Sequence, residues 1–226
     1  MSGAASNQPQ PPNDPELHSS PEPSPHSSPE PAVEAERPAD AAPVAKLAQR
    51  DGGIALAALS LFAAADAWHA VSGLGFATLL SVLDAVVIGV VLGSLAHEWG
   101  HFAGARLSGG IAPTRGIRSL FPIFDLDMQK SDPSAFRAMS VGGNVGHWAV
   151  VLAVLAFLPL DTPGRMALLA STFGFAVAAS TTEFPIIGRA FSGASPVESF
   201  QGLTGAKLRR DRWIGAAAGV LLFVIL

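Results

Sequence analysis

The 226-residue sequence contains no cysteine and few charged residues. Without cysteine, the chain forms no disulfide bond and offers no thiolate to a metal, so any metal site must be built from His, Asp, Glu or water. Charged residues make up 14% of the chain, hydrophobic residues make up 49%, and the mean hydropathy is +0.38. These values are too apolar for an ordinary soluble domain and indicate a protein that crosses a membrane several times.

Large apolar residues are nearly missing from residues 1–45, which are rich in Pro, Ser, Glu and Ala. Such a segment cannot bury enough apolar surface to offset the entropy that it would lose on ordering. We therefore divide the chain into a disordered tail, residues 1–45, and a transmembrane domain, residues 46–226.

The transmembrane domain contains five apolar segments, at about residues 53–71, 76–107, 138–160, 165–182 and 213–226. The last segment is barely long enough to cross a bilayer, so it either spans or lies partly inserted at the interface. We find no internal repeat and no insert large enough to fold as a separate soluble domain. The predicted fold class is all-α, a polytopic membrane helix bundle of about five spans.

Lysine and arginine are distributed unevenly between the two sides of the predicted bundle. They precede the first span, and they fill the loops between the second and third spans and between the fourth and fifth, whereas the opposite loops carry only Arg165. Short loops rich in Lys and Arg stay in the cytoplasm. We therefore expect a protein of the cell (inner) membrane whose amino terminus and two larger loops are cytoplasmic.

The second apolar segment contains the motif His97-Glu98-Trp99-Gly100-His101. On a helix, two histidines four residues apart share a face, so both imidazoles can bind one Zn²⁺ ion. Glu98 beside them can take a proton from water as a general base. Ionisable side chains are costly inside a membrane and are therefore candidates for a functional site.

A catalytic zinc ion usually has three protein ligands, and this motif supplies two. Glu183 is our first choice for the third, because the predicted topology places it at the depth of the two histidines and we expect Pro185 to end its helix there. His147 lies at a similar depth, and Asp127 reaches the site if its loop folds back into the membrane. Both remain alternatives.

The zinc motif in a membrane helix, the loop sequence Leu120-Phe121-Pro122 and the Gly142-Gly143-Asn144 start of the next span together resemble the site-2 protease family of intramembrane zinc metalloproteases. The resemblance covers about residues 86–188 and implies Zn²⁺ as cofactor. The family's third ligand is an aspartate in a Leu-Asp-Gly sequence, which this chain lacks, so Glu183 would replace it.

The resemblance also implies a role for the Gly-rich stretch that includes Asn144 and His147, whose side chains would hold the substrate or donate to the developing oxyanion. Tight helix packing through small residues is an equal alternative for this stretch. The basic loop before it, about residues 106–137, is expected to re-enter the membrane or to offer an edge strand to an unwound substrate.

The resemblance therefore predicts a zinc metalloendopeptidase that cleaves peptide bonds in or near transmembrane segments of other membrane proteins. Its partners would be that membrane-protein substrate and the lipid bilayer, with no nucleic acid. Two other functions stay open, a catalytically inactive membrane adaptor of the same fold and a proton- or ion-coupled carrier that uses His and acidic residues as a relay.

The charge asymmetry yields a topology prediction. Reporter fusions after residues 50, 130 and 205 should report the cytoplasm, and a fusion near Gly164 should report the opposite side, because basic loops are retained. Paired reporters active on only one side of the membrane would measure this. A cytoplasmic signal at Gly164 would contradict the depth argument that brings Glu183 level with His97 and His101.

Overall fold

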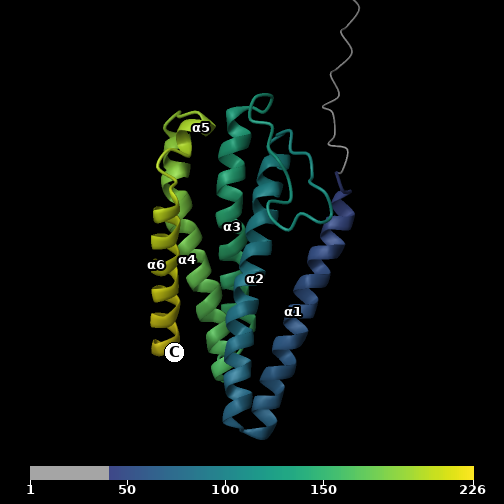
Figure 1. The fold of residues 1–226 in the computed structure, drawn as a ribbon, viewed down its shortest axis with the longest axis vertical. Coiled ribbons are helices and arrows are strands. Elements are labelled where there is room, and N and C mark those ends of the chain that lie inside the picture. Colours follow the sequence, from purple (N-terminus) through teal and green to yellow (C-terminus); the bar gives the residue numbers. More distant parts are fainter. Residues whose placement is uncertain (1–40) are drawn as a thin grey trace, which may run out of the picture. The chain divides into compact units, whose positions relative to one another are not determined.

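A computed structural model describes residues 41–226, which are helical and contain no β-strand. The expected disordered tail therefore falls largely outside the described residues. The helices are α1 (Val44–Ser72), α2 (Gly75–Leu107), α3 (Pro133–Phe157), α4 (Pro163–Phe191), α5 (Pro196–Ser199) and α6 (Gly205–Ile225), shown in Figure 1. This arrangement confirms the all-α class and the helix assignment of the apolar segments.

Four helices, α1 to α4, are long and apolar enough to cross a membrane. The expected fifth span belongs to α6, which does not meet the same criterion within the described residues. Its amino-terminal half carries Lys207, Asp211 and several arginines, so only the part after Trp213 is continuously apolar. The described part of the chain is thus membrane-associated through four candidate spans.

Local sequence signals explain where the spanning helices begin. Asp132 accepts a hydrogen bond from the Ser134 amide at the start of α3, and Thr162 does the same for the Arg165 amide at the start of α4. Each cap is followed by a proline in the first helical turn, where its missing N–H costs nothing. Gly73 joins α1 to α2 with a φ of 64°, a conformation that glycine adopts without strain.

Helix α4 continues through Pro185 to Phe191. The expectation that Pro185 ends this helix was therefore wrong. Proline removes one backbone donor and leaves one carbonyl without its helical partner. Helices in membrane bundles tolerate this when a neighbouring group takes over that carbonyl.

Small residues bring the central helices close together. In Figure 1, α2 lies between α1 and the pair α3 and α4, while α6 lies along α4. A Cβ atom on Gly100 of α2 would overlap the carbonyl oxygen of Gly142 on α3, so the two backbones touch there. A Cβ on Gly143 would overlap the imidazole of His101. The Gly142-Gly143 stretch therefore serves helix packing and leaves room for a motif histidine.

Asp66 and Arg165 form an ion pair at the end of the bundle remote from His97 and His101. The Arg165 Nε lies 2.8 Å from Asp66 Oδ2, and Thr162 donates to the other oxygen of Asp66 at 2.6 Å. Asp66 is only 4% exposed, so these bonds compensate a buried carboxylate. The arrangement joins α1 to α4 and gives Asp66 a structural role.

The loop between α2 and α3 folds back on itself in extended conformation. Backbone bonds run from Arg115 N to Ile123 O at 2.8 Å and from Asp125 N to Pro113 O at 3.0 Å. The Arg115 side chain also hydrogen-bonds the Asp125 carboxylate, which raises the pKa of the guanidinium above its usual value. Arg50 of α1 donates to the Ile117 carbonyl at 2.8 Å and so fixes the loop beside α1.

Candidate metal centre

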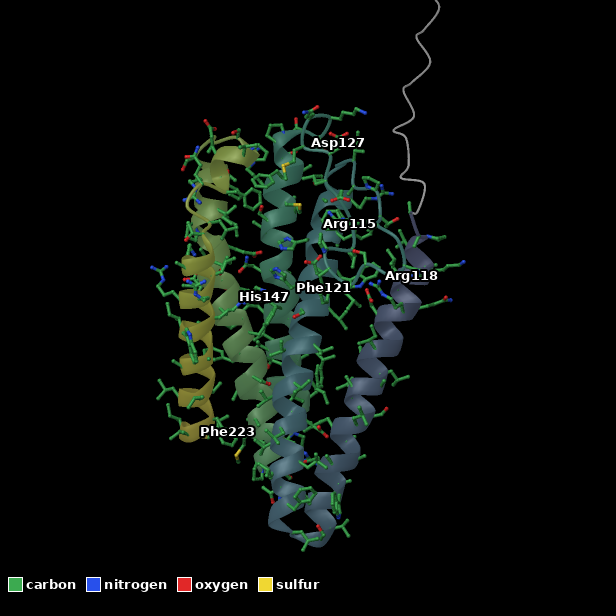
Figure 2. The ribbon with its side chains drawn as sticks, in the orientation of Figure 1. Arg115, Arg118, Phe121, Asp127, His147 and Phe223 are labelled. Atoms are coloured by element: carbon green, nitrogen blue, oxygen red, sulfur yellow. The ribbon has the colours of Figure 1, made fainter. Side chains whose placement is uncertain are left out.

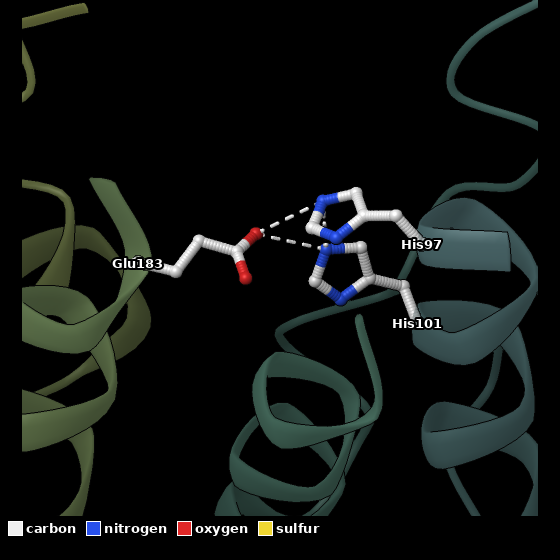
Figure 3. A group of neighbouring side chains, drawn as sticks. All are labelled: His97, His101 and Glu183. Atoms are coloured by element: carbon white, nitrogen blue, oxygen red, sulfur yellow. Dashed lines mark hydrogen bonds and ion pairs between the residues drawn. The ribbon is translucent and has the colours of Figure 1, made fainter. Parts of the chain in front are cut away.

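His97 and His101 of α2 meet Glu183 of α4, as Figure 3 shows. The two Nε2 atoms are 3.1 Å apart. Oε1 of Glu183 lies 3.1 Å from Nε2 of His97 and 3.0 Å from Nε2 of His101. The three side chains are 15% to 16% exposed, so they are mostly buried but still reachable. The structure thus brings together the three residues chosen as ligands from the sequence.

Glu98 follows His97 on α2 but points toward the α2–α3 loop. Its Oε2 accepts a long hydrogen bond of 3.4 Å from the Ile123 amide. The loop therefore supports the carboxylate proposed as general base. The Ile123 side chain itself is buried, 1% exposed, in an apolar cluster that includes Phe102 and Phe124.

Asn144 and His147 of α3 lie behind the cluster of His97, His101 and Glu183. Asn144 donates to Glu183 Oε2 at 2.6 Å, and His147 Nδ1 lies 3.0 Å from His97 Nδ1. His147 is 1% exposed and Asn144 7%, so neither side chain faces open space. Both residues therefore hold side chains of the cluster, and the expected role of Asn144 and His147 in holding the substrate or the oxyanion stays a prediction.

The bonds around Ser180 determine where the protons of this network lie. An ionised Glu183 only accepts, so Asn144 must turn its NH₂ group to Glu183 and its oxygen to Ser180. Ser180 then donates its single proton to Asn144 at 3.0 Å. The Ser180 oxygen accepts from Trp148, which only donates, and from His147 Nε2 at 3.3 Å. His147 therefore carries its proton on Nε2.

This assignment extends to both motif histidines. With Nδ1 of His147 unprotonated, His97 must donate from its own Nδ1. His101 donates from Nδ1 to the Met139 carbonyl at 2.7 Å, since a carbonyl oxygen only accepts. When both imidazoles are neutral, each is therefore left with an unprotonated Nε2. Both Nε2 atoms lie within 3.1 Å of the same carboxylate oxygen of Glu183.

In that neutral state the three electron-pair donors repel one another, and either a metal ion among them or a proton on an imidazole Nε2 removes the repulsion. Two imidazole nitrogens and a carboxylate oxygen form one of the ligand sets of catalytic zinc sites. Tetrahedral bonds of the usual length put such ligand atoms about 3.3 Å apart. The observed separations of 3.0 to 3.1 Å differ little from that value, so the residues fit a metal of this kind. The fit leaves a fourth position for water.

Two further side chains of types that bind metals, Asp127 and His69, lie away from the cluster. Asp127 remains in the α2–α3 loop, where it accepts from the Gln129 and Lys130 amides, and Figure 2 shows it well separated from His147. His69 contacts Thr78 at the remote turn between α1 and α2. Among the described residues, only one group of three or more His, Asp or Glu side chains is close enough to share a metal ion, and it consists of His97, His101 and Glu183.

Sequence reasoning missed the residues that orient this cluster. Ser180 and Trp148 determine the tautomer of His147, and the Met139 carbonyl determines that of His101. The spacing from Ser180 to Glu183 could have signalled one of them, because residues three apart share a helix face. The Met139 carbonyl carries no sequence signal, since any residue supplies one.

A groove of about 590 Å³ leads to the cluster. Residues of α2, α4 and α6 line it, and His97 and Glu183 contribute to its wall. The α4 side consists largely of small residues, among them Ala170, Gly174 and Ala178. Neither Asn144 nor His147 lines the groove, which agrees with their position behind the ligands.

Glu183 should be essential for metal retention. Glu183→Ala removes one of three ligands, so zinc affinity should fall by more than the ~10–100-fold typical of a lost supporting residue. Glu183→Asp keeps the donor but shortens the side chain and should retain part of the affinity. Chelator competition on detergent-purified protein measures both. Wild-type affinity in Glu183→Ala, with loss in Asp127→Ala, would move the third ligand to the loop.

His147 should support His97 without binding the metal itself. His147→Leu leaves the His97 Nδ1–H without its acceptor, and zinc affinity should fall ~10–100-fold. His147→Asn places an amide oxygen near the lost Nδ1 and should recover much of that loss. The same chelator titration applies. Equal affinities for the Leu and Asn variants would show that a hydrogen-bond acceptor at position 147 is not what supports His97.

Comparisons of the chain with models of known protein families, with curated proteins and with solved structures found no match. The feature of the described residues with the clearest chemical meaning is the cluster of His97, His101 and Glu183, whose side chains are close enough to share one metal ion.

Proposed function

We propose that the chain is an intramembrane zinc metalloprotease that hydrolyses peptide bonds in or beside transmembrane segments of other membrane proteins. One observation carries the proposal. Two Nε2 atoms and one carboxylate oxygen converge within 3.1 Å on helices long and apolar enough to span a membrane, and a glutamate stands next to the first histidine. The resemblance of the motif to site-2 proteases supports the same activity.

His97, His101 and Glu183 would hold the zinc ion. Bound there, zinc would supply a Lewis acid that acidifies water and polarises the scissile carbonyl. Glu98 takes the proton from the attacking water and later gives it to the leaving amine. Asn144 and His147 hold Glu183 and His97 in place throughout, so their contribution is orientation.

The substrate would approach through the groove between α2 and α6. Small residues of α4 line one wall of this groove and would leave room for a polypeptide, and His97 and Glu183 also line the groove. A helical segment hides its peptide bonds, so it must unwind before cleavage. The extended α2–α3 loop, which already contacts Glu98 through Ile123, is where an unwound strand would pair. We further propose the cell (inner) membrane as location, with a cytoplasmic amino terminus.

Glu98→Gln tests the activity directly. The variant should lose proteolysis of a co-expressed membrane substrate by at least ~100-fold, because a general base contributes about that much, and it should bind zinc like the wild type. Cleavage is read from the product size and metal from elemental analysis. Substantial turnover by Glu98→Gln would exclude this residue as the base.

The same pair of measurements distinguishes the other functions. An inactive adaptor would bind zinc without cleaving any membrane substrate. A carrier would use the histidines as a proton relay and would need no stoichiometric zinc. Stoichiometric zinc together with cleavage that depends on Glu98 fits only the protease.

A further inference from the structure

Helix α4 has an unmet backbone acceptor two residues before Glu183. Pro185 has no N–H, so the carbonyl oxygen of Thr181 lacks the donor four residues ahead that a regular helix provides. A carbonyl that is shielded from water and has no hydrogen-bond donor raises the free energy of the folded state, and here it would destabilise the helical turn that carries Glu183. Another element must supply the missing donor.

Lys207 of α6 supplies it. Its Nζ lies 3.1 Å from the Thr181 carbonyl oxygen. The ammonium is itself held by Asp211, one helical turn further along α6, and Asp211 is fully buried. Asp211 also accepts from the Thr182 hydroxyl at 3.1 Å. Two consecutive residues of the α4 turn are thus bound to α6 through the Lys207–Asp211 pair.

Close packing of α6 against α4 holds the Lys207–Asp211 pair beside the Thr181 carbonyl. Gly215 and Gly219 of α6 pack closely against α4, where a Cβ on Gly215 would overlap the Gly174 carbonyl. Arg210 donates to the other oxygen of Asp211 at 3.0 Å but makes no hydrogen bond to the α4 backbone. Of these two cations, only Lys207 therefore contacts both the Asp211 carboxylate and the Thr181 carbonyl, which has no N–H partner at Pro185.

We propose that Lys207 is a positioning residue for the metal centre. Its ammonium replaces the backbone donor that Pro185 lacks, and this bond holds the turn of α4 that carries Glu183. The inference rests on the proposed function, since it assumes that Glu183 binds the metal. The proposal also gives α6 a role, although its apolar part is too short to make it a candidate span. The charged first half of α6 supports α4 through the bond from Lys207 to the Thr181 carbonyl.

A double-mutant cycle tests the proposal. Lys207→Met keeps the length of the side chain and removes the donor, so Co²⁺ affinity of the apoprotein should fall ~10-fold or more and the visible spectrum of the Co²⁺ form should change. Pro185→Ala restores an N–H at position 185. In that background, Lys207→Met should lose most of its effect, because Thr181 has regained a helical partner.

Arg210→Met is the matched control, because it also removes a cation from Asp211 but leaves the Thr181 carbonyl bonded. It should keep the Co²⁺ affinity and spectrum of the wild type. An effect of Lys207→Met that is equal in both backgrounds, or an equal loss in Arg210→Met, would overturn the proposal and reduce Lys207 to a general charge partner of Asp211.

The melting temperature of the metal-free protein separates this proposal from the proposed function. Lys207→Met should lower it with Pro185 present and lower it much less in the Pro185→Ala background, whether or not metal binds. If the wild type takes up no Co²⁺, the metal site fails, and the melting cycle still decides whether Lys207 replaces the lost donor. Additive melting shifts would overturn the Lys207 assignment even in a protein that binds metal normally.

Discussion

The site depends on the convergence of two imidazoles and one carboxylate inside a helical bundle. Nε2 of His97, Nε2 of His101 and Oε1 of Glu183 lie within 3.1 Å of one another. With both imidazoles neutral, such a group is unstable in a low-dielectric interior without a cation, so the protein must both hold the three side chains together and supply the compensating charge. The surrounding hydrogen bonds do the first task, and the proposed metal does the second.

Each helix around the cluster has a separate task. Helix α2 carries two of the proposed metal ligands and the proposed base, and α4 carries the third proposed ligand. Helix α3 contributes no ligand but determines the tautomer of His97 through His147 and orients Glu183 through Asn144. Helix α6 contacts the backbone of α4 through Lys207. The supporting residues outnumber the ligands, as expected where ligand geometry must be preorganised.

Irregular backbone is concentrated near the cluster. Pro185 interrupts the hydrogen bonding of α4 two residues after Glu183, and the extended α2–α3 loop reaches Glu98 through Ile123. Both departures are compensated by side chains from other elements, Lys207 in the first case and Glu98 itself in the second. Unpaired backbone groups are tolerated in a membrane bundle only with such partners. The remote end of the bundle, where Asp66 pairs with Arg165, has no comparable interruption in its helices.

The sequence alone determined the all-α class, the positions of the apolar helices and the shared face of His97 and His101, because these follow from hydropathy and from the 3.6-residue period. Composition and depth also singled out Glu183. Only the tertiary structure decided that α4 continues through Pro185, that α6 is not a fifth candidate span, and that Asn144 and His147 lie behind the ligands. These features depend on contacts between helices far apart in sequence. The carbonyls of Thr181 and Met139 show why such contacts are invisible beforehand: every residue has a carbonyl, and only packing decides which donor reaches it.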